Sequence, residues 1–390
     1  MTFGTLALIG LAALLGPLLA LPTRWHLPVV VGELAAGVLL GPTAAGFLHP
    51  TDPTFAFLAD IGFALVMFVA GSHVPVRDPR LITGLRTGAL RAVVIGAVAV
   101  LPAFGLARGF HTGHTALYAV LIASSSAALV LPITDSLQLQ GPALLELLPQ
   151  VAIADAACIV AVPLAVDPAH AGRAAVGAVA VIGAGVALYF VLDRFEHSGL
   201  RRRVHRASEE RKFALELRFS LTVLFGLAAL AVATHVSIML AGFCLGLAVA
   251  GVGEPRKRLA RQLFAVTEGF FGPLFFLWLG AELNLRQLGD HPAFILLGFA
   301  LGGAAIVVHG LMRATGQPLS LAVLAASQLG VPVAAATLGT QAHALAPGEA
   351  AALMLGALVT IGATAFAGSR PAARAAAAPA SGTPGAPEAP

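Results

Sequence analysis

Apolar runs of about twenty residues fill most of the chain, and short stretches rich in Pro, Gly and charged residues separate them. A helical run of this length crosses a bilayer, because a helix rises about 1.5 Å per residue and the hydrocarbon core is about 30 Å thick. The breaks divide the sequence into thirteen predicted spans. Their approximate ranges are 3–21, 27–48, 55–74, 88–107, 113–135, 144–166, 173–193, 213–233, 236–252, 263–283, 292–312, 318–343 and 348–367.

The basic residues test this count, because Lys and Arg collect in cytoplasmic loops. If the N-terminus lies outside, twenty of the 23 Lys and Arg residues fall on the inner side. The exceptions are Arg108, Arg173 and Arg286. One missed helix would invert every later loop, so the asymmetry predicts thirteen spans with the N-terminus outside and the C-terminus in the cytoplasm.

Composition agrees with an all-α polytopic protein of the plasma membrane. Hydrophobic residues make up 58% of the chain and charged residues 11%, against roughly a quarter charged in soluble domains. The net charge of +4 follows from the basic inner loops, so we expect no nucleic-acid partner. Residues 371–390 are rich in Ala and Pro and are predicted to be disordered.

An internal repeat divides the chain near the basic run "RRRVHR". The stretch "GELAAGVLLGP" (32–42) resembles "AGFCLGLAVAG" (241–251), and "LVMFVAGSHV" (65–74) resembles "FFLWLGAEL" (275–283). Both pairs share an offset of about 209 residues. Seven spans separate the copies, and an odd number predicts two inverted-topology repeats, the architecture on which many secondary transporters place a midplane site.

One carboxylate, Asp155, lies near the centre of the sixth span in "QVAIADAACIV" (150–160). A charge at that depth costs at least about 2.5 to 3.5 kcal/mol, so such acids usually serve ions or protons. Spans five, six, twelve and thirteen contain no Lys or Arg to neutralise it. Asp155 is either a protonated acid bonded to a neighbouring helix or a site at which a proton and a monovalent metal cation compete. We favour competition, which is already an exchange mechanism.

Two spans carry polar, proline-containing segments in corresponding positions. Span five has "ASSSAALVLP", in which Ser124, Ser125 and Ser126 precede a proline, and span twelve has "AASQLGVPVA", with Ser327 and Gln328. Such segments are typical of interrupted helices whose hydroxyls and carbonyls bind a cation. Small residues also permit close helix packing, which is the alternative explanation.

Other polar groups within the spans are weaker candidates. Glu33 and His309 stay secondary candidates for a proton relay and for pH sensing, although interhelical hydrogen bonding or packing is the simpler interpretation of each. Glu146, Glu268 and Glu282 lie close to span ends and are interpreted as interfacial groups.

In this order, several segments resemble the monovalent cation/proton antiporter superfamily, in the branch that holds glutathione-gated potassium efflux antiporters and bacterial sodium/proton antiporters. The resemblance covers nearly all of residues 1–367. The segments are "VVVGELAAGVLLGP", "LADIGFALVMFVAG", "SSSAALVL", "AIADAACIVAVPL", "HVSIMLAGFCLGLAVAG", "GFFGPLFFLWLGAELNL" and "LAASQLGVPVA".

The resemblance implies a homodimer in which residues 1–370 form the antiporter domain. The dimerisation part would comprise about 1–80 and 213–285, the core part about 88–166 and 291–367, and a linker helix about 173–193. Two interrupted helices would cross in the core, and the family's essential aspartate maps onto Asp155.

The sequence departs from the family pattern at four places. Ala154 stands where electrogenic members carry a second acid, Gly302 and Gly303 lie near the position of a membrane-embedded base, and Ser72 with His73 replace an acid. The C-terminal nucleotide-binding domain of the glutathione-gated members has no counterpart in the sequence, so we expect no regulation by that route.

These observations predict a secondary antiporter that exchanges Na⁺ or K⁺ for H⁺ without a cofactor and contributes to pH homeostasis. With a single acid, the site is neutral both with a proton and with a monovalent cation, which predicts electroneutral exchange. The alternatives are a channel or leak pathway, a sodium-coupled carrier of organic anions, and a non-transporting sensor. An enzyme is not expected, because no nucleophile, base and orienting residue occur together.

Overall fold

The computed structural model describes residues 1–21, 29–72, 76, 79–136, 139, 141–166, 171–197, 215–234, 236–252, 263–282 and 285–368. All regular secondary structure in this part of the chain is helical. The helices are α1 (Phe3–Ala13), α2 (Leu15–Ala20), α3 (Val29–Leu40), α4 (Pro53–Ser72), α5 (Pro79–Gly109), α6 (Thr115–Ala123), α7 (Ala127–Ser136), α8 (Pro142–Val166), α9 (Ala171–His197), α11 (Leu215–Ala233), α12 (Ile238–Val252), the π-helix η2 (Thr267–Phe271), α14 (Gly272–Glu282), α15 (Leu285–Asp290), α16 (Pro292–Gly310), the 3₁₀-helix η3 (Leu311–Thr315), α17 (Leu319–Ala325), α18 (Gly330–Gln341) and α19 (Glu349–Gly368).

The described helices account for all thirteen predicted spans and confirm an all-α polytopic fold. Eight helical segments are long and apolar enough to cross a membrane, and three shorter apolar helices accompany them. The remaining two spans are α3 and the pair α6–α7. Large apolar side chains are exposed along α5, α9 and α16, including Leu101, Val176 and Leu296, as expected for surfaces that face lipid.

Spans five and twelve are interrupted, as the sequence predicts. Residues 124–126 separate α6 from α7, and residues 326–329 separate α17 from α18. Neither proline causes its break, because each break precedes its proline: Pro132 lies inside α7, and Pro332 lies in the first turn of α18, where a missing N–H leaves no bond unmade. The first break starts instead where the Ser124 hydroxyl donates to the Leu121 carbonyl, at 2.8 Å.

Equivalent helices of the two halves pack in the same way, as a repeat predicts. Helix α3 of the first half packs on α14 of the second, and α12 of the second half packs on α4 of the first. The two contacts use equivalent glycines: a Cβ at Gly37 would meet Gly280, and a Cβ at Gly246 would meet Gly71. Helices α5 and α8 pack together as α16 and α19 do. Glycine is required at these crossings because the helix backbones touch.

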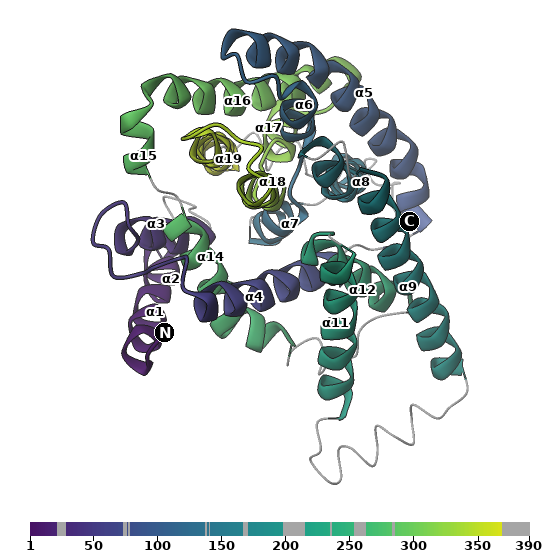
Figure 1. Cartoon of the computed structure of the whole chain (residues 1–390). Coiled ribbons are helices and arrows are strands. Elements are labelled where there is room, and N and C mark those ends of the chain that lie inside the picture. Colours follow the sequence, from purple (N-terminus) through teal and green to yellow (C-terminus); the bar gives the residue numbers. More distant parts are fainter. Residues whose placement is uncertain are drawn as a thin grey trace, which may run out of the picture.

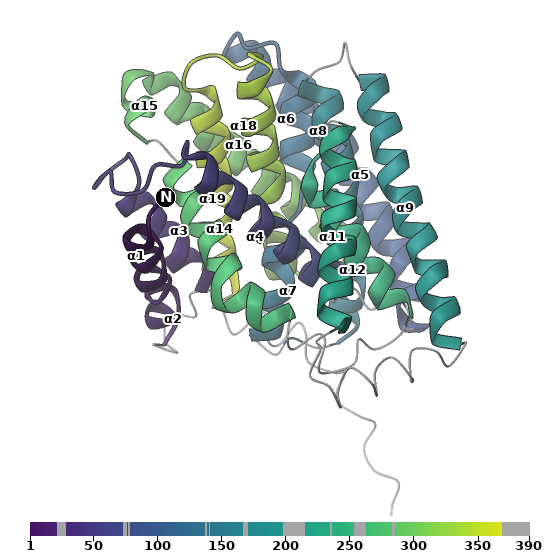
Figure 2. The ribbon, with the colours of Figure 1, turned by 60° about the horizontal axis from the view of Figure 1, so that its bottom comes forward.

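The helices form two groups in space (Figure 1). Helices α1–α4, α12 and α14 contact one another, and α5–α8 with α16–α19 form the second group. Helix α9 contacts α8, α11 and α12 at the edge of both groups. The connections α5–α6 and α18–α19 and helix α15 lie at the same end of the bundle, which we call the α15 end (Figure 2).

The largest departure from the predicted boundaries concerns span four. Helix α5 begins at Pro79 rather than near residue 88, so Arg80 and Arg86 belong to the helix and not to a loop. The run "RRRVHR" and the tail 371–390 lie outside the described residues.

Candidate functional site

Asp155 lies on α8 with its side chain 1% exposed, and its carboxylate meets the start of a half-helix. The Asp155 Oδ2 atom accepts the backbone N–H of Ala127, the first residue of α7, at 2.8 Å. The first N–H groups of a helix have no partner within the helix and carry a partial positive charge. The start of α7 therefore stabilises the ionised form of this carboxylate.

The three serines of the first break are all buried. Ser124 closes the end of α6, as described above, and the Ser126 carbonyl begins the hydrogen bonding of α7 by accepting the Val130 N–H at 2.9 Å. Ser125 reaches the other break: its hydroxyl donates to the Ala325 carbonyl at 2.7 Å. The break thus brings hydroxyl and carbonyl oxygens next to the Asp155 carboxylate.

A side chain from the second break also bonds to the first interrupted helix. The Gln328 side-chain Nε2 donates to the Leu121 carbonyl at 2.6 Å, so each interrupted helix satisfies a carbonyl freed in the other. The Gln328 backbone N–H donates to the Thr360 hydroxyl on α19 at 3.1 Å. Thr360 therefore accepts a backbone N–H at the second break, as Asp155 accepts one at the first, with a neutral hydroxyl instead of a carboxylate. Ser327 donates to Leu324 within its own chain turn, at 2.9 Å.

His309 joins this cluster, whereas Glu33 does not. The His309 ring is fully buried on α16, its Nδ1 lies 2.9 Å from the Ala305 carbonyl and its Nε2 lies 3.5 Å from the Ser125 hydroxyl. A carbonyl only accepts, so Nδ1 donates to Ala305, and Nε2 lies at the limit of hydrogen-bond distance from the Ser125 oxygen, whose hydrogen goes to the Ala325 carbonyl. Glu33 is buried against Gly16 of α2, and α3 packs on α2 and α14.

Arg91, near the cytoplasmic end of the fourth predicted span, forms an ion pair that the sequence did not predict. Arg91 is buried on α5; its Nη1 donates to Glu146 Oε2 at 2.8 Å and its Nε to the Thr315 hydroxyl at 2.9 Å. The pair joins α5, α8 and η3. The only signal in the sequence was Glu146 itself, an acid near the start of the sixth span. That its partner is Arg91 is known only from the packing of α5 on α8.

A buried glutamine pair lies on the same side of Asp155 as Arg91. Gln317 Nε2 donates to Gln150 Oε1 at 3.0 Å, and the second polar atom of each amide has no partner. Two orphaned atoms, one donor and one acceptor, fit a bridging water. Gln150 is the first residue of the stretch that contains Asp155, and nothing in its sequence pattern marked it.

A second carboxylate cluster ties the core helices together at the α15 end. Glu349 Oε1 accepts from the Tyr118 hydroxyl at 2.6 Å and lies 2.7 Å from His114 Nδ1. The hydrogen bond to Glu349 raises the pKa of His114 above its usual value, and partial burial opposes this only in part. Protonation of His114 therefore strengthens the link between the start of α6 and the start of α19.

Comparison with known proteins places this geometry in a family. A family model described as "Sodium/hydrogen exchanger, transmembrane" matches residues 10–368. The chain is 24% identical to YjbQ of Bacillus subtilis over 379 residues, covering 91% of this chain and 61% of YjbQ. It is 27% identical to the Na⁺/H⁺ antiporter NhaS5 of Synechocystis over 309 residues, covering 77% of this chain and 42% of NhaS5. The chain thus spans about three fifths of the first relative and less than half of the second.

A solved structure shares the fold. The sodium proton antiporter MjNhaP1 from Methanocaldococcus jannaschii, determined at pH 8, matches with a TM-score of 0.62 at 15% identity. The match covers 94% of this chain and 96% of that one. Inverted repeats with two interrupted helices are therefore the shared architecture.

Proposed function

The chain belongs to the sodium/hydrogen exchanger family, and from this premise we propose that it exchanges a monovalent cation, Na⁺ or K⁺, for H⁺ across the plasma membrane. Its relatives carry antiporter names and are transporters rather than enzymes. Exchange of this kind adjusts cytoplasmic pH at the expense of a cation gradient.

The observation that carries the proposal is the contact between Asp155 and the start of α7. A carboxylate in hydrocarbon is costly when ionised, and the half-helix N-terminus offsets only part of that cost. A proton or a metal cation removes the remainder. Because both occupy the same carboxylate, binding of one requires release of the other, and this competition couples their movements.

The oxygens of the first break are the proposed further ligands. Alkali cations prefer oxygen donors, and the buried hydroxyls of Ser124, Ser125 and Ser126 lie with the carbonyl ends of the interrupted helix at the break beside Asp155. Ser327 and Gln328 hold the second break against the first. The Ala325 carbonyl keeps the Ser125 hydroxyl oriented.

Alternating access follows from the two groups of helices. We propose that α5–α8 and α16–α19 form the moving core and that α1–α4, α11, α12 and α14 form the dimerisation part, with α9 as linker. The support is that both breaks, Asp155 and their cross-links lie within one group, so that group can move as a unit with its ligand.

The single acid sets the proposed stoichiometry. Ala154 precedes Asp155 on α8 and is buried, and Arg91 is already paired with Glu146. The site is then neutral with a proton bound and neutral with a monovalent cation bound. One-for-one exchange would move no net charge.

The test is cation-induced proton movement in inverted vesicles, scanned over Li⁺, Na⁺ and K⁺. Asp155→Asn should abolish it, because the amide neither titrates nor attracts the cation. Glu33→Gln is the matched control, since it neutralises a second buried acid outside the cluster, and it should retain exchange. Retained exchange in Asp155→Asn would refute the assignment. Cation flux that needs no counter-ion would indicate a channel instead.

A further inference from the structure

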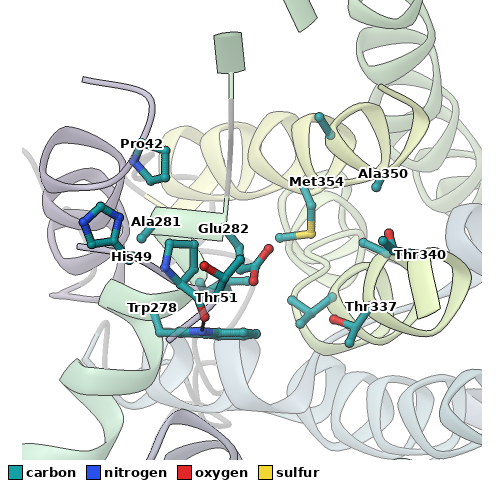
Figure 3. A pocket seen from close by; sticks show the side chains of 15 residues that line it. Pro42, His49, Thr51, Trp278, Ala281, Glu282, Thr337, Thr340, Ala350 and Met354 are labelled. Atoms are coloured by element: carbon teal, nitrogen blue, oxygen red, sulfur yellow. Dashed lines mark hydrogen bonds between the residues drawn. The ribbon is translucent and has the colours of Figure 1, made fainter. Parts of the chain in front are cut away.

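A cavity of about 420 Å³ opens between the two groups of helices at the α15 end (Figure 3). One wall consists of α14 and the segment 42–51 that precedes α4, and the other consists of α18 and the start of α19. A space of this size holds roughly a dozen water molecules. A cation inside it would keep much of its hydration shell.

The wall formed by α18 leads toward the second break. Val333, Ala336, Thr337 and Thr340 line the cavity at the spacing that puts them on one face of the helix. Thr337 and Thr340 are exposed there. Val333 lies one turn from Gly330, the first residue after the break. The cavity thus follows α18 from the molecular surface to the edge of the buried cluster.

The opposite wall is held in place by hydrogen bonds to loop carbonyls. The Trp278 indole Nε1 donates to the Pro50 carbonyl at 3.0 Å, and Arg286 Nε donates to the Thr43 carbonyl at 2.9 Å. The guanidinium of Arg286 is therefore engaged with the back of the loop. A rigid wall keeps the residues that face the cavity at a defined distance from α18.

Glu282 is the one carboxylate among the lining residues, and His49 is the only other titratable side chain among them. Glu282 is exposed, and its side chain projects from the end of α14 into the cavity (Figure 3). None of the described residues forms a hydrogen bond or an ion pair with it. Glu349, at the start of α19, is fully buried and bonded to Tyr118 and His114, so it contributes little to the field in the cavity.

Two helix ends add to the negative potential. Both α14 and α18 end at this cavity, and the last carbonyls of a helix carry a partial negative charge. We propose that the cavity is an access vestibule in which Glu282 collects the hydrated monovalent cation before it reaches Asp155. This inference rests on the proposed exchange function, and the predicted topology places the vestibule on the external side.

Charge-selective labelling tests the vestibule without relying on transport. The native thiols, Cys158 and Cys244, are buried, so Thr337→Cys and Thr340→Cys can be labelled in intact cells with membrane-impermeant methanethiosulfonates of either charge. Both positions should react from outside, and faster with the cationic reagent. Ala335→Cys, on the buried face of α18, should not react.

Labelling rates in a variant without the Glu282 charge give the decisive comparison. Glu282→Gln should reduce the ratio of cationic to anionic labelling rates severalfold at low salt, because a carboxylate on the facing wall attracts one reagent and repels the other. Glu268→Gln removes an exposed acid at the other end of the same span and should change nothing. An unchanged ratio in Glu282→Gln, or labelling from the cytoplasmic side alone, would overturn the inference.

A transport measurement separates this inference from the proposed function. Glu282→Gln should raise the external KM for the cation about fourfold and leave kcat unchanged, because it alters collection and not the exchange step. If Asp155→Asn keeps exchanging while labelling stays charge-selective, the proposed role of Asp155 fails and the vestibule stands. If exchange depends on Asp155 but Glu282→Gln has the wild-type KM and labelling ratio, the vestibule fails alone.

Discussion

Insensitivity to membrane voltage is the sharpest consequence of a site with one carboxylate. Consider proteoliposomes in which opposing cation and pH gradients are adjusted until no net flux occurs. At this null point, the free energy of the cation gradient balances that of the proton gradient plus the work done on any net charge. If Asp155 is the only acid that carries ions, that work is zero.

The magnitude follows from the charge moved per cycle. One elementary charge crossing 100 mV is worth about 2.3 kcal/mol, which corresponds to roughly a fiftyfold change in the balancing cation ratio. The wild-type protein should show no shift when such a potential is imposed. Ala154→Asp places a second carboxylate beside the first, and a variant that carries two protons per cation should shift by that full amount.

The shift of the null point with voltage decides the stoichiometry. A tenfold or larger shift of the wild-type null point would refute one-for-one exchange, whatever the variant does. Ala154→Ser is the matched control for the Asp substitution, because it adds a polar group of smaller size without a charge, and its null point should not move. If Ala154→Asp does not fold, the wild-type measurement still decides the stoichiometry.

Three further substitutions probe the structure around the site. Gln328→Leu removes the donor to the first break and should lower stability by about 1 to 3 kcal/mol, measured as an earlier thermal transition in detergent; an unchanged transition would contradict the cross-link. Glu349 raises the pKa of His114 from its ordinary value of 6.5. The interaction of protonated His114 with Glu349 therefore stabilises the folded protein fully below pH 6.5, and this contribution is lost as the pH rises through the raised pKa. Thermal stability of the wild type should therefore fall over that interval, and His114→Gln should flatten the profile; an equally steep profile in the variant would exclude this pair as the cause. Gly280→Ala places a Cβ against a backbone carbonyl of α3 and should cost about 1 to 3 kcal/mol, whereas Gly226→Ala, which has open space, should fold as the wild type does; equal yields of folded protein would show that the helices can separate.

The spans could be predicted because the bilayer imposes local rules. Span length, the cost of charge and the preference of Arg for one side act within about twenty residues, so runs of apolar residues identified all thirteen segments. The interruptions of spans five and twelve could also be predicted, since "SSSAA" and "SQLGVP" concentrate groups that compete with helix hydrogen bonds. The prolines do not cause the interruptions, because a proline in the first turn of α18 is compatible with the helix.

The partners of the polar groups were not predictable in this way. Ser125 donates to a carbonyl 200 residues away, and Gln328 donates across 207. The ion pair between Arg91 and Glu146 was not predictable either, because it depends on how α5 packs on α8. Hydropathy periodicity carries no information about which helices cross or about the depth at which they do so.

For Asp155, the sequence and the tertiary structure supply different information. The sequence alone determined that a solitary acid lies at mid-span beside Ala154, since burial of a charge is costly wherever the span packs. Only the tertiary structure decided that this carboxylate meets the first N–H of α7, that Thr360 accepts a backbone N–H at the second break, and that Glu282 faces a cavity rather than the membrane interface. The physical reason is that a hydrogen bond or a cavity wall requires atoms placed within a few tenths of an ångström, and close contact between glycine-lined helices provides that placement.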